Sequence, residues 1–250
     1  MHTEHNTMNI EINDSLMRKV VYAISKAVTQ DLPQDRRENH KETNNRYRSA
    51  VGDYINDNLR NLVVEDGVSL LPFNRGGWEG RILTDDVGRI TYTIMRSKTL
   101  RSAMRVKRNA PYYQQSLLFI ENGDCEGCKQ MSLFGEDSSV FSPEEYAEDF
   151  DRIFQGMIDK TAGYRHYIVT YETSSNEITD IQLLFLDKNF AEVDSKSLKD
   201  YLTPDFAALT SNGTEDNASS NDKEHNHHKE GLLKVRPGVK PILRVNEMEA

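Results

Sequence analysis

Two aspartates and a lysine in the C-terminal half of the chain could hold a metal ion and cleave a phosphodiester bond. They are Asp180, Asp194 and Lys196. A metal-dependent nuclease needs two or three carboxylates on neighbouring strands, often with a lysine beside them, because the carboxylates bind Mg²⁺ and the metal activates the attacking water. A catalytic site on these three residues is therefore one hypothesis for the chain.

The order Asp194-Ser195-Lys196, with Asp180 before it, resembles the acid-x-lysine element of the restriction-endonuclease-like family. The resemblance implies a magnesium-dependent nuclease. This sequence departs from the family pattern in two ways, because no proline precedes Asp180 and residues 192–199 are too polar for a central strand. A solvated turn is the alternative interpretation.

The two cysteines, Cys125 and Cys128, supply half the ligands of a zinc site, which His40 or His166 would have to complete. Thiol–disulfide exchange enzymes use the same spacing, but they place it at the start of a long helix, whereas Gly135 and acidic residues follow here. Two unrelated thiols are the third interpretation. We expect no resident cofactor, with zinc and magnesium as the open alternatives.

The pentapeptide Gln130-Met131-Ser132-Leu133-Phe134 places two large apolar side chains in a polar stretch. It closely resembles the docking peptide by which many bacterial and phage proteins bind the replication sliding clamp. The resemblance implies that Gln130 is the polar anchor, that Leu133 and Phe134 are inserted, and that Met131 and Ser132 are spacers. It implies a partner and no activity. The alternative is that Leu133 and Phe134 pack on this protein's own core.

A basic stretch precedes the cysteines, since residues 96–108 carry six basic side chains and no acidic one. On a helix over residues 99–107, Arg101 and Arg105 share one face. Two tyrosines that follow could stack on bases or sugars. The predicted nucleic-acid interface is Lys98, Arg101, Arg105, Lys107, Arg108, Tyr112 and Tyr113. The alternative is a solvated helix, or one that pairs with the acidic helix at residues 144–151.

The formal net charge of −9 argues against a protein that coats nucleic acid without selectivity. Residues 136–151 hold seven acidic side chains and no basic one, so one face could attract a polyanion while another repels it. No run of 18 apolar residues occurs, and the N-terminus lacks the order of a secretion signal. The sequence therefore predicts no membrane span and, by default, a cytoplasmic location.

Apolar spacing of three and four predicts a helix over residues 14–30, ended by Pro33, and a second over residues 46–62. The charged residues 31–45 are expected to be a mobile connector between them. Ser142, Pro143 and Glu145 predict the capped start of a further helix. A last short helix should end near Leu202.

Alternating apolar residues predict strands over residues 68–73, 78–83, 89–95, 164–172 and 177–186, and an apolar run predicts one more over residues 115–121. The turn at Arg75-Gly76-Gly77 should join the first two, with Trp78, the only tryptophan, as a core or edge anchor. Thr91 and Thr93 alternate with apolar neighbours, which indicates a sheet with one wet face.

Hairpins and the absence of strand-helix-strand crossovers favour an α+β fold with a mainly antiparallel sheet and several packed helices. We expect a flexible N-terminus at residues 1–12, one domain at 13–210, a disordered polar linker at 211–230, and a basic segment at 231–250 that is an edge strand or a second docking peptide. The predicted function is that of an accessory or regulatory protein of DNA metabolism, from a phage, a mobile element or a bacterial host, that docks on the sliding clamp. The alternatives are the nuclease and a protein-interaction or defence-related module without clamp contact.

Overall fold

The computed structural model describes residues 12–39, 42–43, 45–106, 108–125 and 141–202, which belong to one compact unit. Most of the predicted flexible segment 1–12, and all of 211–230 and 231–250, lie outside the described residues. None of the described helices is long and apolar enough to cross a membrane.

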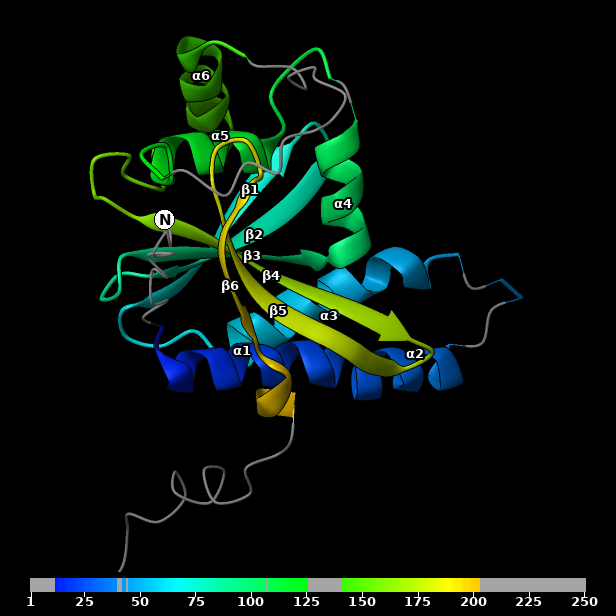
Figure 1. Cartoon of the computed structure of the whole chain (residues 1–250). Coiled ribbons are helices and arrows are strands. Elements are labelled where there is room, and N and C mark those ends of the chain that lie inside the picture. The colour runs from blue at the N-terminus through cyan, green and yellow to red at the C-terminus, as the bar shows by residue number, and fades with distance from the viewer. Residues whose placement is uncertain (1–11, 40–41, 44, 107, 126–140, 203–250) are drawn as a thin grey trace, which may run out of the picture. The chain divides into compact units, whose positions relative to one another are not determined.

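Helices and strands alternate in groups along the chain (Figure 1). The helices are α1 (Asp14–Lys26), the π-helix η1 (Ala27–Asp31), α2 (Leu32–Glu38), α3 (Tyr47–Leu62), α4 (Ser97–Arg105), α5 (Tyr113–Glu121), α6 (Pro143–Phe154) and the 3-10 helix η2 (Lys199–Leu202). The strands are β1 (Val68–Arg75), β2 (Trp78–Asp85), β3 (Ile90–Arg96), β4 (Arg165–Ser174), β5 (Glu177–Leu186) and β6 (Glu192–Ser197).

All six strands form one sheet in the order in which they occur along the chain, β1-β2-β3-β4-β5-β6. Every neighbouring pair is antiparallel except β3 and β4, which are parallel. The predicted α+β fold with a mainly antiparallel sheet is confirmed. The expectation that crossovers are absent is wrong, because parallel strands cannot be joined by a tight turn and α4, α5 and α6 lie between β3 and β4.

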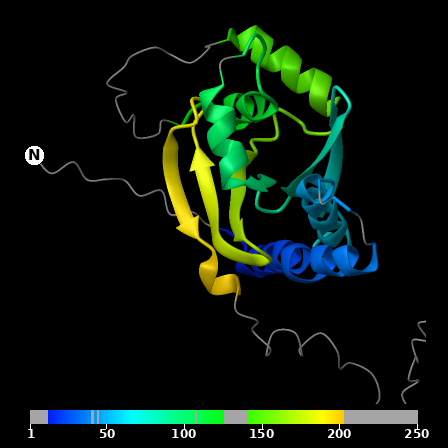
Figure 2. The same cartoon turned by 90° about the vertical axis from the view of Figure 1, so that its right-hand side faces the viewer.

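Helices cover both faces of the sheet, so the unit has three layers (Figure 2). Successive side chains on a strand point to opposite faces, and β3 divides accordingly. Tyr92 joins the core beneath α1 and α3, whereas Met95 joins the core beneath α4, α5 and α6. The sheet is therefore buried on both faces, and side chains on either one must be apolar or paired.

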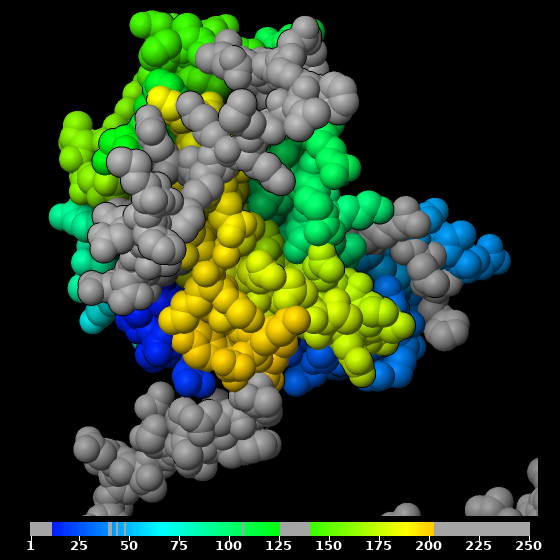
Figure 3. Space-filling view, viewed as in Figure 1, coloured from blue at the N-terminus to red at the C-terminus, as the bar shows by residue number. Residues whose placement is uncertain are grey.

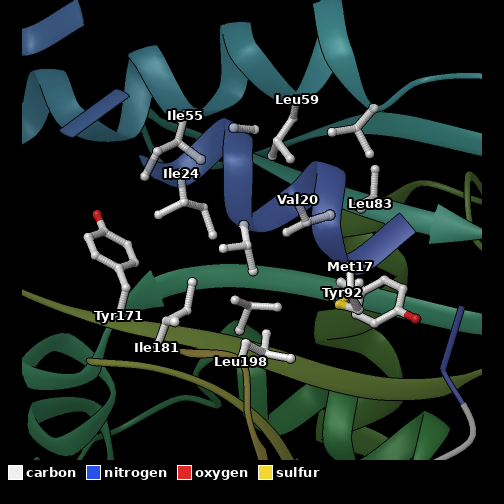
Figure 4. Close-up of a cluster of buried hydrophobic side chains, with 14 of the residues drawn as sticks. Met17, Val20, Ile24, Ile55, Leu59, Leu83, Tyr92, Tyr171, Ile181 and Leu198 are labelled. Atoms are coloured by element: carbon white, nitrogen blue, oxygen red, sulfur yellow. The ribbon is translucent and has the colours of Figure 1, made fainter. Parts of the chain in front are cut away.

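The first core packs α1 and α3 against the sheet (Figure 4). Met17, Val20 and Ile24 from α1 meet Leu83, Tyr92 and Ile181 from the strands, with Ile55 and Leu59 from α3 above them. The second core is richer in aromatic rings. Phe73 from β1 lies 5.2 Å from Tyr113 of α5 and 5.4 Å from Phe154 of α6, measured between ring centroids.

Two local predictions are wrong. Residues 31–45 are not simply a connector, because α1 runs through the π-helix into α2. Pro33 lies at the start of α2, directly after the π-helix, where the regular hydrogen-bond pattern of an α-helix is already interrupted. Residues 115–121 form the helix α5 and not a strand, since Gln115 accepts the Tyr112 N–H at 3.0 Å and so closes a helical turn.

Other expected elements are confirmed. Ser142 and Glu145 cap α6 reciprocally, with the Glu145 N–H donating to Ser142 Oγ at 3.2 Å and the Ser142 N–H donating to Glu145 Oε2 at 2.7 Å. The turn between β1 and β2 holds Gly76 and Gly77 at positive φ, which side chains disfavour.

The interpretation of residues 192–199 as a solvated turn is wrong, because Glu192–Ser197 form β6 and pair with β5. The polar strand β6 lies at the edge of the sheet, and it reaches the surface in the space-filling view (gold, Figure 3).

Candidate functional site

The predicted docking residues Gln130, Met131, Ser132, Leu133 and Phe134 lie within residues 126–140, outside the described part of the chain. The residues on either side of this segment are fixed to packed helices. The Cys125 N–H donates to the Asn122 carbonyl at 2.9 Å, just after α5. The Phe141 ring, just before α6, packs edge-on against Tyr146, which stacks on Phe119 of α5 at 4.6 Å. Both ends of the segment are thus tied to the α5–α6 pair.

The basic helix is α4, and Met104, expected on its buried face with Leu100 and Ala103, is exposed instead. Leu100 and Ala103 are buried, whereas Lys98, Arg101 and Arg105 are exposed. The Arg101 guanidinium lies 2.8 Å from Glu172 on β4, and both side chains are solvent-exposed, so the pair is weak and part of the charge is neutralised. Lys107 lies outside the described residues.

Arg108 has a structural role that its sequence position did not indicate. Its guanidinium donates to the backbone oxygen of Ala103 at 2.7 Å and to that of Val106 at 3.3 Å. These carbonyls lie at the C-terminal end of α4, where the helix leaves its last acceptors unpaired and where positive charge is favourable. The same guanidinium lies over the Tyr112 ring, 4.5 Å from its centroid.

The two tyrosines before α5 differ in environment. Tyr113 is buried in the second core, so the prediction that it stacks on a base is wrong. Tyr112 is half-buried, and its ring is approached by Arg75 at 4.9 Å as well as by Arg108. Burial raises the pKa of both phenols, so both are neutral at physiological pH. Trp78 is 53% exposed and is not a core residue.

The candidate catalytic residues do not share a site. On β6, Asp194 pairs with Phe185 and Lys196 with Leu183, and opposite residues of an antiparallel pair point to the same face. Asp180 lies five positions from Phe185 on β5 and therefore points to the other face, where it contacts Lys199 at 3.1 Å. Lys196 instead contacts Asp14 of α1 at 3.5 Å. The arrangement that the acid-x-lysine resemblance implies is not formed.

No zinc site is assembled in the described part of the chain, which contains no cluster of three or more metal-ligating side chains. Cys128 and His40 are outside it. Cys125 is half-buried, and burial raises the pKa of its thiol, so it is mostly protonated at neutral pH. His166 is fully buried between the sheet and α5, where other residues occupy both its ring nitrogens.

A buried polar network surrounds His166, and the sequence did not predict it. Thr91 Oγ1 lies 2.8 Å from His166 Nδ1 and also hydrogen-bonds Glu121 Oε2 of α5. Thr93 Oγ1 and Gln114 Oε1 each lie 3.1 Å from His166 Nε2. Both threonines are almost fully buried, so the face expected to be wet is covered by α5. Burial raises the pKa of Glu121 to about 8 and lowers that of His166 to about 3.

The contacts and the shifted pKa values together indicate where the hydrogens of this network lie. Gln114 Oε1 can only accept, so His166 Nε2 carries a hydrogen and, in the neutral ring, Nδ1 accepts. Thr91 has one hydroxyl hydrogen, which it gives to Nδ1. With both His166 and Glu121 neutral, as their shifted pKa values indicate, the carboxyl group supplies the hydrogen between Glu121 and Thr91. The burial of Glu121 and its raised pKa both indicate that Glu121 is neutral. A protonated acid also explains how Glu121 Oε1 stays buried without a partner.

The neighbouring Asn122 joins α5 to two strands. Its amide donates to the His166 carbonyl at 2.9 Å and to the Leu186 carbonyl at 2.8 Å, and its oxygen accepts the His166 N–H at 2.9 Å. Tyr167 and Phe185 are the terminal pair of the β4–β5 ladder. His166 and Leu186 lie one position beyond this pair, and Asn122 supplies hydrogen-bond partners for their backbone groups. The pair Asn122-Gly123 resembles an ordinary turn in sequence, which hid this role.

The chain matches one family model over residues 9–248, and that model is described as a family of unknown function (DUF5986). The chain belongs to the DUF5986 family. No curated protein and no solved structure matches it.

The described part of this DUF5986 chain thus has two polar regions of different character. The network around His166 is closed to solvent, so its chemistry is structural. The surface around Tyr112 is open and carries guanidinium groups beside aromatic rings, which suits it to bind anions and flat bases. Arg75 and Trp78 belong to it, although the sequence favoured only a hairpin turn there, because both lie more than 30 residues before Tyr112.

Proposed function

We propose that this DUF5986 protein is an accessory or regulatory protein of DNA metabolism that docks on the DNA sliding clamp. The observation that carries the proposal is the pentapeptide Gln130-Met131-Ser132-Leu133-Phe134. A glutamine followed after two residues by a leucine and an aromatic ring provides one polar anchor and two side chains for a pocket. The partner belongs to the replication machinery, so the proposal includes a cytoplasmic location in a bacterial cell and a bacterial, phage or mobile-element origin.

The expected affinity follows from the size of the inserted pair. Burial of a leucine and a phenylalanine supplies roughly 3–6 kcal/mol before ordering costs are counted. The peptide loses conformational freedom on binding, so a dissociation constant of about 1 μM is expected. Such an affinity suits a protein that must exchange with other clamp partners, whether it recruits a reaction to DNA or blocks polymerase access, because both use the same pocket.

The placement of the charged helices supports the DNA-directed part of the proposal. The basic helix α4 packs on β3 and β4, whereas the acidic helix α6 packs on α5 and β1. Exposed basic residues on α4 and exposed carboxylates on α6 therefore sit over different parts of the sheet (Figure 1). A polyanion can meet the first without approaching the second, in line with the charge asymmetry of the sequence.

The clamp proposal is tested by calorimetric titration of the purified chain into the sliding clamp of the host. Changing Gln130, Leu133 and Phe134 together to alanine should weaken binding by about 100-fold or more, because each 1.4 kcal/mol lost is a factor of ten. The matched control changes the spacers Met131 and Ser132 to alanine and should weaken binding by less than about tenfold. Both variants should melt like the parent chain.

Two outcomes would contradict the proposal. If the triple variant binds like the parent, the clamp is not held by this peptide. If the triple variant unfolds, Leu133 and Phe134 belong to the protein's own core, and the chain is better described as an interaction or defence-related module without clamp contact. The nuclease alternative is not favoured, because Asp180 and Asp194 point to opposite faces of the sheet.

A further inference from the structure

The tip of the β1–β2 hairpin and the segment before α5 together form one surface, the hairpin-tip surface, made by Arg75, Trp78, Arg108 and Tyr112. Trp78 is exposed, and the other three side chains are partly exposed. Arg75 and Trp78 face each other across the last pair of the hairpin ladder, so their side chains point to the same face of the sheet. Arg75 reaches the Tyr112 ring at 4.9 Å, and Arg108 reaches the same ring at 4.5 Å. The four residues come from segments far apart in sequence that the fold brings together.

Trp78 is exposed but held in place. Its indole is 53% exposed, the largest apolar ring among the exposed residues that the structure describes. One side of it packs on the second core, with the Phe73 ring at 5.6 Å and the Tyr113 ring at 5.8 Å between centroids. An aromatic ring fixed in this way loses little freedom on binding, so its open face is a ready stacking platform.

The two arginines carry charge that the described residues do not neutralise. Among these residues, neither Arg75 nor Arg108 makes an ion pair with a carboxylate, and both guanidinium groups lie against one ring. The nearest acidic neighbour in sequence, Glu79, points to the opposite face from Trp78 and pairs with Arg81 at 3.7 Å. Two like charges held near one ring repel each other, and an anion between them would remove that repulsion.

We propose that the hairpin-tip surface binds single-stranded nucleic acid, with a base stacked on Trp78 and backbone phosphates paired with Arg75 and Arg108. A flat ring can accept a base only when that base is free of its own neighbours, which a duplex does not allow. Guanidinium groups match phosphate geometry and can stack at the same time. This inference deepens the DNA-directed part of the proposed function, but it requires no clamp.

The chain contains a single tryptophan, so its intrinsic fluorescence reports on this surface directly. Titration of the full chain with oligo(dT) and, separately, oligo(rU) at low salt should quench Trp78 emission with a saturating curve. The matched duplex should quench it at least tenfold more weakly. Raising the salt concentration should weaken binding, because phosphate contacts release counterions. The DNA and RNA arms separate the two sources of the strand.

The arginine contribution is tested by Arg75→Gln, which removes one charge at an exposed turn and leaves the cap formed by Arg108 intact. It should weaken binding about tenfold and lower the slope of log affinity against log salt by about one. Arg60→Gln is the control, because Arg60 is exposed on α3, in the layer on the other side of the sheet, and should change neither quantity. A Trp78→Leu chain, followed by anisotropy of labelled oligonucleotide, should lose at least about tenfold in affinity.

Three results would overturn the inference. They are unchanged Trp78 emission with both oligonucleotides at low salt, equal quenching by duplex and single strand, and equal affinity for Arg75→Gln and Arg60→Gln. The chain with Gln130, Leu133 and Phe134 changed to alanine should still bind the oligonucleotide. Loss of clamp binding alone therefore leaves this inference standing, and loss of oligonucleotide binding alone leaves the clamp proposal standing.

Discussion

Replacing Asn122 by alanine should lower the free energy of unfolding by about 3–5 kcal/mol, the largest effect expected of any single substitution discussed for this fold. The side chain is fully buried and satisfies the carbonyls of His166 and Leu186 and the His166 N–H. Alanine leaves all three groups in the protein interior without partners, and each unpaired group costs about 1–3 kcal/mol. The loss should appear as a lower midpoint in urea-induced unfolding with an unchanged slope.

The control for this prediction is Asn61→Ala. Asn61 is exposed on α3, where alanine is the better helix former, so its free energy of unfolding should stay within about 0.5 kcal/mol of that of the parent chain. If the two alanine variants unfold at the same urea concentration, the hydrogen bonds from Asn122 to the backbone of His166 and Leu186 contribute nothing to stability.

The second large effect is a pH dependence set by Glu121. Burial raises the pKa of this carboxyl from 4.5 to about 8 in the folded chain. Unfolding exposes the carboxyl and returns its pKa to the lower value, so the folded state binds the proton more tightly. The stability that Glu121 contributes is complete below pH 4.5 and is lost as the pH rises toward 8. At about 1.4 kcal/mol per pKa unit, reduced by relaxation of the site, the loss between pH 5 and pH 8 should be about 2–4 kcal/mol.

The variant Glu121→Gln keeps the shape of the neutral acid and cannot ionise. Its free energy of unfolding should therefore depend less on pH between 5 and 8, and it should be more stable than the parent at pH 8. Glu148→Gln, at an exposed position on α6, is the control and should keep the parent's pH profile. Because His166 changes stability with pH in the same range, the decisive quantity is the difference between the two chains. If Glu121→Gln and the parent have the same pH profile between pH 5 and pH 8, the pKa of Glu121 is not raised in the folded chain.

His166 has the opposite dependence. Burial lowers the pKa of its ring from 6.5 to about 3, so its contribution is complete above pH 6.5 and is lost as the pH falls toward 3. Thus Glu121 favours acidic conditions and His166 favours neutral ones. Burial keeps both groups in their neutral forms, and the Thr91 hydroxyl hydrogen-bonds both of them. This is why the network can lie between sheet and helix without a compensating charge.

Local signals in the sequence predicted much of the fold. The helix stripes of α1 and α3, the turn with Gly76 and Gly77, and the cap formed by Ser142 and Glu145 each depend on residues a few positions apart. Such patterns predict structure well because the local structure that they favour depends little on contacts with the rest of the molecule. The run at residues 117–120 led to the wrong prediction of a strand, because a short apolar segment fits a buried strand and a buried helix equally well. In the helix α5, Leu117 and Leu118 both pack into the second core, a tertiary contact that the local sequence does not reveal.

The candidate sites were predicted less well, because they join residues that are distant in sequence. The contact of Arg75 with Tyr112 spans the β1–β2 hairpin, β3 and α4. The alternation of Thr91 and Thr93 with apolar residues indicated a solvent-exposed face of β3, but α5 covers this face and both threonines are buried. The acid-x-lysine pattern does not form a site, because successive residues of a strand point to opposite faces of the sheet. Asp180 on β5 is an odd number of positions from Phe185, the partner of Asp194 on β6, so the two aspartates point to opposite faces. Spacing along the chain could not decide any of these points.

The most direct test of the clamp proposal is competition for one pocket. A fluorescently labelled peptide of residues 126–140 is bound to the purified sliding clamp of the host, and its anisotropy is followed as unlabelled full-length chain is added. The proposal predicts that the peptide binds with a dissociation constant of about 1 μM and that the full chain displaces it, while the chain with Gln130, Leu133 and Phe134 changed to alanine does not. A full-length chain that leaves the anisotropy unchanged would contradict it.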